Sequence, residues 1–485
     1  MQDIEELAKR RGFFWKSSEI YGGLSGFYDY GHLGKLLKNK WEAAWRATFL
    51  RSDNFYEIET AQIVPEAVLV ASGHVTSFVD PVVRCSKCGT VERADHLVEA
   101  ELKESFEGMT PQQLDELIAK HHIRCRKCKG TFEETGIMNM MFSLSAGTGK
   151  DAQKAYLLPE TAQGAYLNFN RCFEHLRKQL PLGLAIIGRA YRNEISPRNA
   201  LLRMREFRQA ELQIFFDPDT IDKHEGFDSI AGDELLLLPH GSQHVRTISC
   251  AAAVRDLKLP RLYVYCLRQM QRFFLDVMHV NPASFRFREL SAEEKAFYNK
   301  YHWDAELKLS LGWKEVAGCH YRTDHDLAGH QKQTKKALAV TVNGKKVLPH
   351  VLELSFGVDR TVYALLDLCV RQNEGRDFFA FPAWLAPYDA AVFPLVNRDG
   401  MNTKARELAE RLKRHASIFY DDSGSIGRRY RRVDEIGVPF AITVDAQTLQ
   451  DGTVTLRDRD TMQQTRIPID ELPALLKERT TLRLE

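Results

Sequence analysis

The segment 188–211, GRAYRNEISPRNALLRMREFRQAE, combines arginines, glutamates and one phenylalanine in a pattern suited to holding a nucleotide. Two short apolar runs flank a polar loop with Pro197, which predicts a β-hairpin. Alternate strand residues share a face, so one face is expected to carry Arg192 and Glu194, and another Arg203, Arg205 and Phe207. Guanidinium groups bind phosphate oxygens, and an aromatic ring stacks on a base. A solvated basic hairpin is the alternative.

Four of the nine cysteines form two CxxC pairs, Cys85 with Cys88 and Cys125 with Cys128. Each pair can fold into a tight turn that directs two thiolates at one ion, and four sulfurs complete the tetrahedral set that Zn²⁺ prefers. Such a closed site has no open position, so the metal is expected to be structural. The alternative, four unrelated buried cysteines, fits the spacing less well. A helix is expected at 109–121, with Thr110 as its cap and Pro111 in its first turn.

Two charged residues stand at predicted helix starts. Glu160 follows Pro159 in the block PETAQG. Its negative charge interacts favourably with the dipole at a helix N-terminus, or its side chain faces a pocket that receives an ammonium group. Arg360 precedes the apolar helix expected at 361–370, where the dipole disfavours a cation. A phosphate between this arginine and the helix N-terminus would resolve the mismatch, whereas a surface ion pair is the alternative.

Composition limits the classes of protein that remain. A chain of 485 residues with 27% charged and 44% hydrophobic residues is expected to form roughly two to four domains with buried cores. A formal net charge of +2 argues against coating of nucleic acid but permits local basic patches. No apolar run approaches the roughly 20 residues of a membrane span, and the N-terminus lacks the apolar core of a secretory signal. With cysteines paired for metal binding, we expect a cytoplasmic protein without membrane contact.

The elements that must position these residues can be read from periodicity. A helix is expected at 33–50, where Leu37, Trp41, Trp45 and Phe49 form a stripe that is usually core and less often a subunit interface. A strand follows at 55–64, and a strand pair is expected at 305–310 and 313–318. After a linker at 380–387, strands at 390–395, 417–420 and 440–444 alternate with helices at 403–415 and 426–436, which predicts an α/β domain.

A basic cluster lies in the second of those helices, around Tyr430. Basic residues with an aromatic ring suit single-stranded RNA, and a solvated helix face is the alternative. The cluster consists of Arg428, Arg429, Arg431 and Arg432.

The order of these pieces resembles the three motifs of class II aminoacyl-tRNA synthetases. The blocks YGGLSGFYDYG, PETAQG, RNEISPR…REF, RTDHDL and DDSGSIGRRYRRVDEIG look like the homodimeric glycyl-tRNA synthetases in particular, and the similarity runs from Phe13 to about Pro468. It implies an α/β fold, with an antiparallel-sheet catalytic domain, a zinc-binding insertion and a C-terminal anticodon-binding domain. The implied catalytic segments are 1–84 with motif 1, 136–216 with motif 2 and 301–384 with motif 3. The zinc insertion would be 85–135, a mixed helical insertion 217–300, and the anticodon-binding domain 385–485.

The resemblance also implies a reaction: glycine and ATP give glycyl-adenylate and pyrophosphate, and the glycyl group passes to the 3′ end of tRNA(Gly), with Mg²⁺ and a structural Zn²⁺ in a homodimer. Arg192, Glu194 and Arg360 would be catalytic. ATP would be bound by Arg192, Asn193, Glu194, Leu202, Arg203, Arg205, Phe207, Glu315, Val316, Gly357 and Arg360, with Glu315 helping to coordinate Mg²⁺. Glycine would be bound by Arg93, Glu160, Phe207, Glu211, Arg322, Glu353 and Ser355. The tRNA would contact Arg428, Arg429, Arg431 and Arg432, and zinc the four paired cysteines.

Within this resemblance, glutamates surround the ammonium group and Ser355 fills the space of a larger side chain. The sequence departs from the family pattern at Leu354, where proline is common, and at Asp359, where a small or neutral residue is frequent. An inward-facing acid at Asp359 would weaken phosphate binding. Two rival interpretations remain: a non-catalytic, nucleic-acid-binding accessory subunit of this fold, and an adenylate-forming ligase for another amino acid. The presence of all five motif residues argues against the accessory subunit; these are Arg192, Glu194, Arg203, Phe207 and Arg360. A ligase for another amino acid is disfavoured by the pocket set Glu160, Glu211, Glu353 and Ser355.

Overall fold

The computed structural model describes residues 4–51, 54–103, 106, 109–176, 178–197, 199–296, 298–373 and 375–484. The first helix of the described residues is α1 (Ile4–Arg11). It leads into the short pair β1 (Phe14–Lys16) and β2 (Tyr28–Tyr30). Residues 1–3, included in the expected N-terminal segment, lie outside the described residues, as do Arg198 of the hairpin segment and Glu485.

A nine-stranded sheet forms the centre of the larger body, in the order β13-β12-β14-β15-β16-β19-β11-β10-β3. Its neighbours are antiparallel except for the pairs β10–β3 and β12–β14. The strands are β3 (Phe55–Glu57), β10 (Leu182–Tyr191), β11 (Glu206–Phe216), β12 (Glu234–Leu238), β13 (Arg246–Ser249), β14 (Phe285–Glu289), β15 (His302–Leu309), β16 (Gly312–Thr323) and β19 (His350–Gly357). The strand pair expected around Glu315 is confirmed as β15 and β16.

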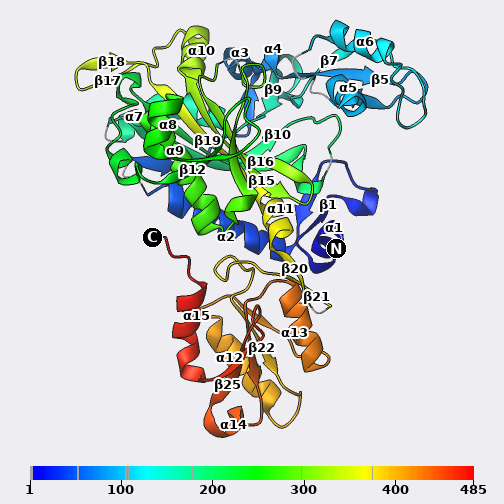
Figure 1. Ribbon diagram of the computed structural model, residues 1–485, viewed down its shortest axis with the longest axis vertical. Helices are drawn as coiled ribbons and strands as arrows, with labels where there is room; N and C mark the ends of the chain where they lie inside the picture. Colours follow the sequence, from blue (N-terminus) through cyan, green and yellow to red (C-terminus); the bar gives the residue numbers. More distant parts are fainter. Residues whose placement is uncertain are drawn as a thin grey trace.

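Helices cover both faces of this sheet, because successive strand residues point to opposite sides. On one face lie α2 (His32–Phe49), α9 (Arg261–Arg272) and α11 (Val358–Cys369); α7 (Ala162–His175) covers the other (Figure 1). The aromatic stripe of α2 is fully buried within the chain, with Trp41 against Phe273 and Trp45 against Phe356 at centroid distances of 5.5 and 6.0 Å. The stripe is therefore core, which excludes its use as a subunit interface.

The predicted hairpin is confirmed, because β10 and β11 pair from Leu182 with Phe215 to Tyr191 with Glu206. The prediction that its arginines lie on strand faces is wrong. Regular pairing stops at Tyr191, and only Phe207 lies on a strand; the other four predicted residues lie in the connecting loop. The loop folds back because Asn199 adopts a left-handed conformation (φ 58°) and Ala200–Leu202 form a buried 3₁₀ turn.

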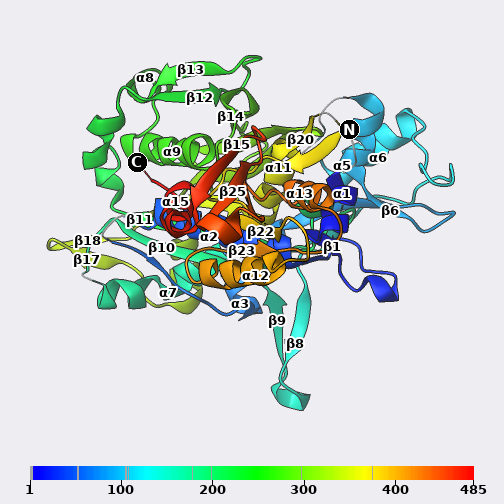
Figure 2. The same cartoon turned by 90° about the horizontal axis from the view of Figure 1, so that it is seen from below.

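The insertion that carries the cysteine pairs has its own small core. Strands β5 (Val79–Arg84), β6 (Val91–Arg93) and β7 (Gly136–Asn139) form a sheet, covered by α5 (Ala94–Leu102) and α6 (Pro111–Lys120). The predicted cap of α6 is confirmed: Gln113 N donates to Thr110 Oγ1 at 3.3 Å in a capping box. The insertion lies at one side of the larger body (Figure 1). The separate hairpin of β8 (Ser143–Ala146) and β9 (Gln153–Leu157) projects from the larger body in another direction (Figure 2).

Residues 217–300, expected to form a mixed helical insertion, contribute to the central sheet as well. They contain α8 (Cys250–Leu257) and α9, but also strands β12, β13 and β14, which extend the central sheet. The segment 55–64, expected as one strand, contains β3 and then β4 (Ile63–Pro65), which pairs with β9 instead.

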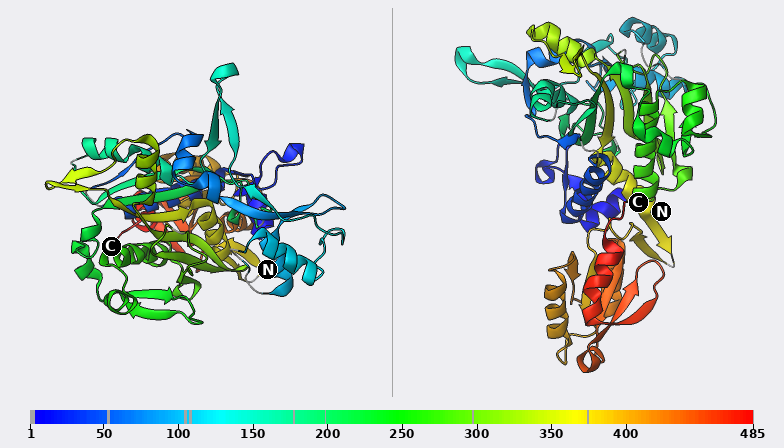
Figure 3. Two further views of the ribbon diagram at one scale, coloured as in Figure 1. Left: turned by 90° about the horizontal axis from the view of Figure 1, so that it is seen from above. Right: turned by 90° about the vertical axis from the view of Figure 1, so that its left-hand side faces the viewer.

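The C-terminal part is the predicted α/β unit. Strands β22 (Ala390–Pro394), β23 (Ile418–Tyr420) and β24 (Phe440–Val444) run parallel, and β25 (Thr453–Asp458) and β26 (Gln464–Pro468) extend the sheet antiparallel. Helices α12 (Met401–Leu412), α13 (Ile426–Glu435) and α15 (Leu472–Thr480) pack on it. The unit sits at one end of the elongated molecule (Figure 3). Its Glu435 pairs with Arg11 of α1 and Asp389 pairs with Lys40 of α2. No helix among the described residues is long and apolar enough to span a bilayer.

Candidate active site

A cavity of about 310 Å³ opens beside the loop between β10 and β11 and the N-terminus of α11. It brings together side chains from segments as distant in the sequence as those of His74 and Arg360. Among the sequence-predicted residues, the cavity is lined by Glu160, Arg192, Glu194, Leu202, Arg203, Phe207, Glu211, Glu315, Arg322, Glu353, Ser355, Gly357 and Arg360.

One side of the cavity is rich in arginine. The guanidinium of Arg192 lies over the Phe207 ring at 5.3 Å, and its Nε donates to Pro159 O at 3.1 Å. Arg203 Nε donates to Glu194 Oε2 at 2.7 Å, and Arg360 Nη1 lies 3.0 Å from Glu315 Oε1. Three cations therefore converge beside an aromatic ring and two acids that hold two of them in position. This is chemistry suited to a polyphosphate with an attached base.

The opposite side is acidic and buried. Strand register creates it: Glu211 of β11 is directly opposite Ser355 of β19, and Glu353 is opposite His320 of β16. Ser355 Oγ donates to Glu211 Oε1 at 2.8 Å, and Thr161 Oγ1 donates to Glu211 Oε2 at 2.6 Å. These contacts fix the Glu211 carboxyl at the cavity floor.

Arg322 neutralises part of this acidic group. Its Nη1 donates to Glu353 Oε2 at 2.6 Å, its Nη2 lies 3.3 Å from Glu160 Oε1, and its Nε donates to Asp326 Oδ2 at 3.0 Å. Burial alone would raise the pKa of Glu160 and Glu353, but the charge of Arg322 holds both below their ordinary values. Two of the acids are thus ionised and already paired.

Glu211 behaves differently, since the hydrogen bonds to its carboxyl come from hydroxyl groups rather than from a cation. Burial, followed by the negative charges of Glu353 and Glu160, raises its pKa to about 8. Glu211 is therefore mostly protonated at neutral pH in the empty cavity. An entering cation would stabilise its carboxylate form.

Four predicted site residues do not line the cavity. Arg205 donates to Glu194 O at 2.9 Å and to Ser25 O at 3.0 Å, so it ties the loop to the glycine-rich segment 21–31. Arg93 pairs with Asp80 at 3.2 Å, and Val316 is buried in β16. The backbone N of Asn193 donates to Met140 O at 2.6 Å. The structure places these four residues outside the cavity lining, and their contacts with ATP and glycine stay predictions.

The two departures from the family pattern have local explanations. Asp359 borders the cavity but is buried and held away from Arg360: Tyr30 OH donates to its carboxylate at 2.6 Å and Lys38 Nζ at 3.0 Å. Leu354 is buried in β19 between Leu212 and Cys319. Asp359 thus anchors α11 to α2 and does not compete for phosphate.

Sequence reasoning missed several polar residues at the acidic side. His74 Nε2 lies 3.7 Å from Glu160 Oε1, and Gln163 Nε2 donates to Glu160 at 2.9 Å and to Asp326 at 3.0 Å. Asp326 had a signal, since it follows Arg322 by four residues in RTDHDL. His74 had none. The cavity also contains His302, Asp304 and His320.

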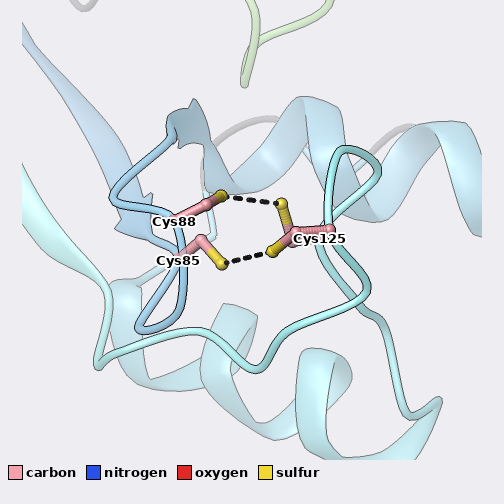
Figure 4. A group of neighbouring side chains, drawn as sticks. Cys85, Cys88 and Cys125 are labelled. Carbon is pink, nitrogen blue, oxygen red and sulfur yellow. Dashed lines mark hydrogen bonds between the residues drawn. The ribbon is translucent and has the colours of Figure 1, made fainter.

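The four paired cysteines converge in the insertion, and Figure 4 labels three of them, Cys85, Cys88 and Cys125. Cys85 Sγ lies 3.4 Å from Cys128 Sγ, Cys88 Sγ lies 3.7 Å from Cys125 Sγ, and all four sulfurs lie within 4.8 Å of one another. A Cβ on Gly130 would approach Cys85 Sγ to 3.1 Å, so glycine at this position leaves room for the cysteine cluster. Four thiolates at these separations fit one tetrahedral zinc ion.

The four arginines of α13 are not equivalent. Arg429 is buried, and its guanidinium donates to Gly424 O at 2.7 Å, Asp422 O at 3.1 Å and Pro394 O. The prediction that Arg429 contacts RNA is therefore wrong. Its guanidinium instead supports the preceding loop from within. Arg432 pairs with Asp421 at 2.8 Å, whereas Arg428 and Arg431 are exposed.

Comparisons with known proteins agree with this geometry. A family model described as tRNA synthetase class II core domain (G, H, P, S and T) matches residues 148–368, and one described as anticodon binding domain matches 389–479. The fold is also similar to a crystal structure titled as the RNA binding domain of threonyl-tRNA synthetase from Cryptosporidium parvum Iowa II. That likeness has a TM-score of 0.63 at 18% identity and covers 100% of this chain and 99% of the other.

Similarity to two archaeal proteins extends over the full length. The chain is 39% identical to the glycine–tRNA ligase of Pyrococcus furiosus, with 98% of each chain covered. It is 38% identical to the glycine–tRNA ligase of Methanocaldococcus jannaschii, with 99% of this chain and 98% of the other covered. The expected fold class is confirmed, and these relatives favour a ligase over the accessory-subunit alternative. The chain belongs to the glycine–tRNA ligase family of class II aminoacyl-tRNA synthetases.

Proposed function

We propose that the cavity activates glycine with ATP and that the chain then transfers the glycyl group to the 3′ end of tRNA(Gly). The observation that carries this proposal is the meeting of two opposed charge sets in one cavity, three arginines beside Phe207 and three buried glutamates beyond them. The arginine side suits a triphosphate and the acidic side suits an ammonium group. Full-length similarity to glycine–tRNA ligases supports the same reaction.

In the proposed first step, the glycine carboxylate attacks the α-phosphorus, and pyrophosphate leaves as glycyl-adenylate forms. Arg192 holds the α-phosphate and stabilises the charge that develops on its oxygens. Phe207 stacks on adenine, and Arg203 and Arg360 hold the β- and γ-phosphates. The reaction needs positioning and electrostatic stabilisation rather than a protein nucleophile.

Glycine recognition is proposed to combine charge and exclusion. The ammonium group of glycine meets Glu211, whose proton is displaced as the cation arrives, while Arg322 keeps Glu160 and Glu353 ionised nearby. Ser355 borders this space and excludes a side chain on the α-carbon. A single methyl group discriminates weakly in an open apolar pocket, so a fixed wall is needed.

Two metals are part of the proposal. Glu315, half-exposed beside Arg360, is a carboxylate ligand for Mg²⁺ that arrives with the phosphates. The four cysteines hold a structural Zn²⁺, which supplies folding free energy to the insertion.

The proposed partners follow from the family. Arg428 and Arg431 on α13 contact the anticodon region of tRNA(Gly), and two chains form a homodimer, which sedimentation at micromolar concentration tests. We assign the enzyme to the cytoplasm, where the thiols of the nine free cysteines stay reduced.

Exchange of labelled pyrophosphate into ATP tests the reaction class. We expect exchange with glycine and far less with alanine or serine. No exchange with any amino acid would support the accessory-subunit alternative, and exchange with another amino acid would support a ligase of different specificity.

A further inference from the structure

Three residues of the catalytic cavity have no part in the reaction described above. They are His302 and Asp304 on β15 and His320 on β16, and their ligand atoms all lie within 4.8 Å of one another. The sheet register explains the cluster. His302 is directly opposite His320, and Asp304 is directly opposite Gly318, so all four positions share one face.

The register also leaves a space between the three side chains. A Cβ on Gly318 would lie 2.3 Å from His320 Nε2 and 3.3 Å from Asp304 Oδ1. Any other residue at Gly318 would therefore fill the gap between the imidazole and the carboxylate. Across that gap, His302 Nε2 lies 3.0 Å from Asp304 Oδ1.

Second contacts orient both imidazoles so that Nε2 faces the space. His320 Nδ1 lies 3.3 Å from Glu353 Oε1, and a proton on Nδ1 donated to this carboxylate leaves Nε2 with a free lone pair. A carboxylate behind an imidazole is the usual arrangement for a metal-binding histidine.

His302 has a similar support on its far side. Its Nδ1 lies 3.4 Å from Asn299 Nδ2, and Asn299 Oδ1 is buried and has no hydrogen-bond partner within the described part of the chain. Exchange of the amide oxygen and nitrogen by rotation lets Oδ1 accept a proton from His302 Nδ1. That rotation satisfies the buried oxygen and frees His302 Nε2 as a ligand.

We propose that His302 Nε2, Asp304 Oδ1 and His320 Nε2 bind one divalent transition-metal ion of the Zn²⁺ class. Imidazole suits zinc, cobalt and nickel, whereas Mg²⁺ prefers oxygen ligands, so this site differs from the proposed magnesium site at Glu315. Arg288 Nη2 lies 3.8 Å from the other oxygen, Asp304 Oδ2, and leaves Oδ1 to the metal. Three protein ligands leave one position open to the cavity for water or a substrate oxygen.

Metal stoichiometry tests the proposal without reference to activity. The full chain is dialysed against low-micromolar free Zn²⁺ and analysed by mass spectrometry, and we expect two bound ions per wild-type chain. His320→Ala should keep one ion, in the cysteine site. Cys88→Ser should also keep one, and the double variant should keep none. His74→Asn, at another histidine of the same cavity, should keep two.

Cobalt substitution gives a second readout that identifies the ligands. The first Co²⁺ equivalent should show the charge-transfer absorption of thiolate ligands, and a second equivalent should add d–d bands without it. Asp304→Asn should lose only the d–d bands of the second Co²⁺ equivalent. This variant tests the same site if His320→Ala folds poorly. One ion per wild-type chain, or two in folded His320→Ala and Asp304→Asn, would overturn the site.

Discussion

Glu211 is the residue on which amino-acid recognition depends most. It is 1% exposed, it accepts hydrogen bonds from Thr161 and Ser355, and its pKa is raised to about 8 by burial and by two neighbouring acids. Arg322 already pairs with those two acids. Glu211 is therefore the acid left to exchange its proton for the ammonium group of a ligand.

Glycine binding should release a proton from Glu211. At pH 7 the carboxyl is mostly protonated in the empty cavity, and a bound cation favours the ionised form, so glycine affinity should rise from about pH 6 to about pH 8. Calorimetric titration in two buffers of different ionisation enthalpy measures the released protons.

The matched variant for this titration is Glu211→Gln, which keeps the shape but cannot ionise. It should bind glycine at least about tenfold more weakly, because it loses a charge-assisted hydrogen bond. Its binding should release no proton in this pH range. Equal proton release by the variant and the wild type would remove Glu211 from the account.

Ser355 should control discrimination against alanine. Ser355→Gly opens space beside the α-carbon, and we expect the ratio of kcat/KM for glycine over alanine to fall by about tenfold, the scale set by one methyl group. Ser355→Ala is the control: it keeps the bulk but loses the hydrogen bond to Glu211, so it should weaken glycine use without gaining alanine use. Pyrophosphate exchange with both amino acids measures this. An unchanged ratio in Ser355→Gly argues against the steric role.

At the scale of elements, the hairpin of β10 and β11 joins the two halves of the site. Its two short apolar runs predicted both strands, and the polar segment with Pro197 predicted the loop between them. The loop's path was not predictable from residue types. It depends on the buried turn Ala200–Leu202 and on Arg205, which bonds to a carbonyl at Ser25, far away in the sequence.

Long-range register is the other limit on prediction from sequence. The pairing of Glu211 with Ser355, and of His302 with His320, arises from strands that alternation alone cannot align. Local signals performed better: the CxxC spacing predicted the cysteine cluster, and Thr110 with Pro111 predicted the start of α6. At Arg429 a local signal was misleading. Its basic neighbours suggested contact with RNA, whereas its side chain is buried against carbonyl groups of the preceding loop.

Loss of zinc should unfold the insertion and leave the central sheet intact. The small core around Val83 and Leu114 is separate from the main core, and Cys125→Ser removes one of the four ligands. Hydrogen exchange should show lost protection in 85–135 while β10, β11 and β19 keep theirs. Cys172→Ser, a half-buried cysteine outside the cluster, is the control. Full protection of the insertion in metal-free Cys125→Ser would contradict a structural zinc.

At the scale of the molecule, the C-terminal unit is attached firmly to the catalytic body. Lys40 of α2 pairs with Asp389 at 2.7 Å, and Arg11 of α1 pairs with Glu435 of α13. The exposed arginines of α13 and the catalytic cavity are therefore carried on one framework. A tRNA that contacts both would be held in one orientation.

Arg428→Ala combined with Arg431→Ala should separate the two steps of the reaction. Both side chains are exposed, so their loss should weaken tRNA use by about three- to tenfold and lower its salt dependence. Glycine-dependent pyrophosphate exchange should not change. Arg414→Ala, an exposed arginine elsewhere in the same unit, should alter neither step. An equal loss in exchange would mean that the double variant disturbs the fold.

Charging of a tRNA(Gly) transcript with labelled glycine tests the whole account most directly. The wild-type chain should attach glycine in an ATP-dependent reaction, and Arg192→Ala should lose at least about a hundredfold in rate, because its guanidinium acts on the transition-state charge. Absence of glycine attachment by the folded, zinc-loaded wild-type chain, or a normal rate in Arg192→Ala, would contradict it.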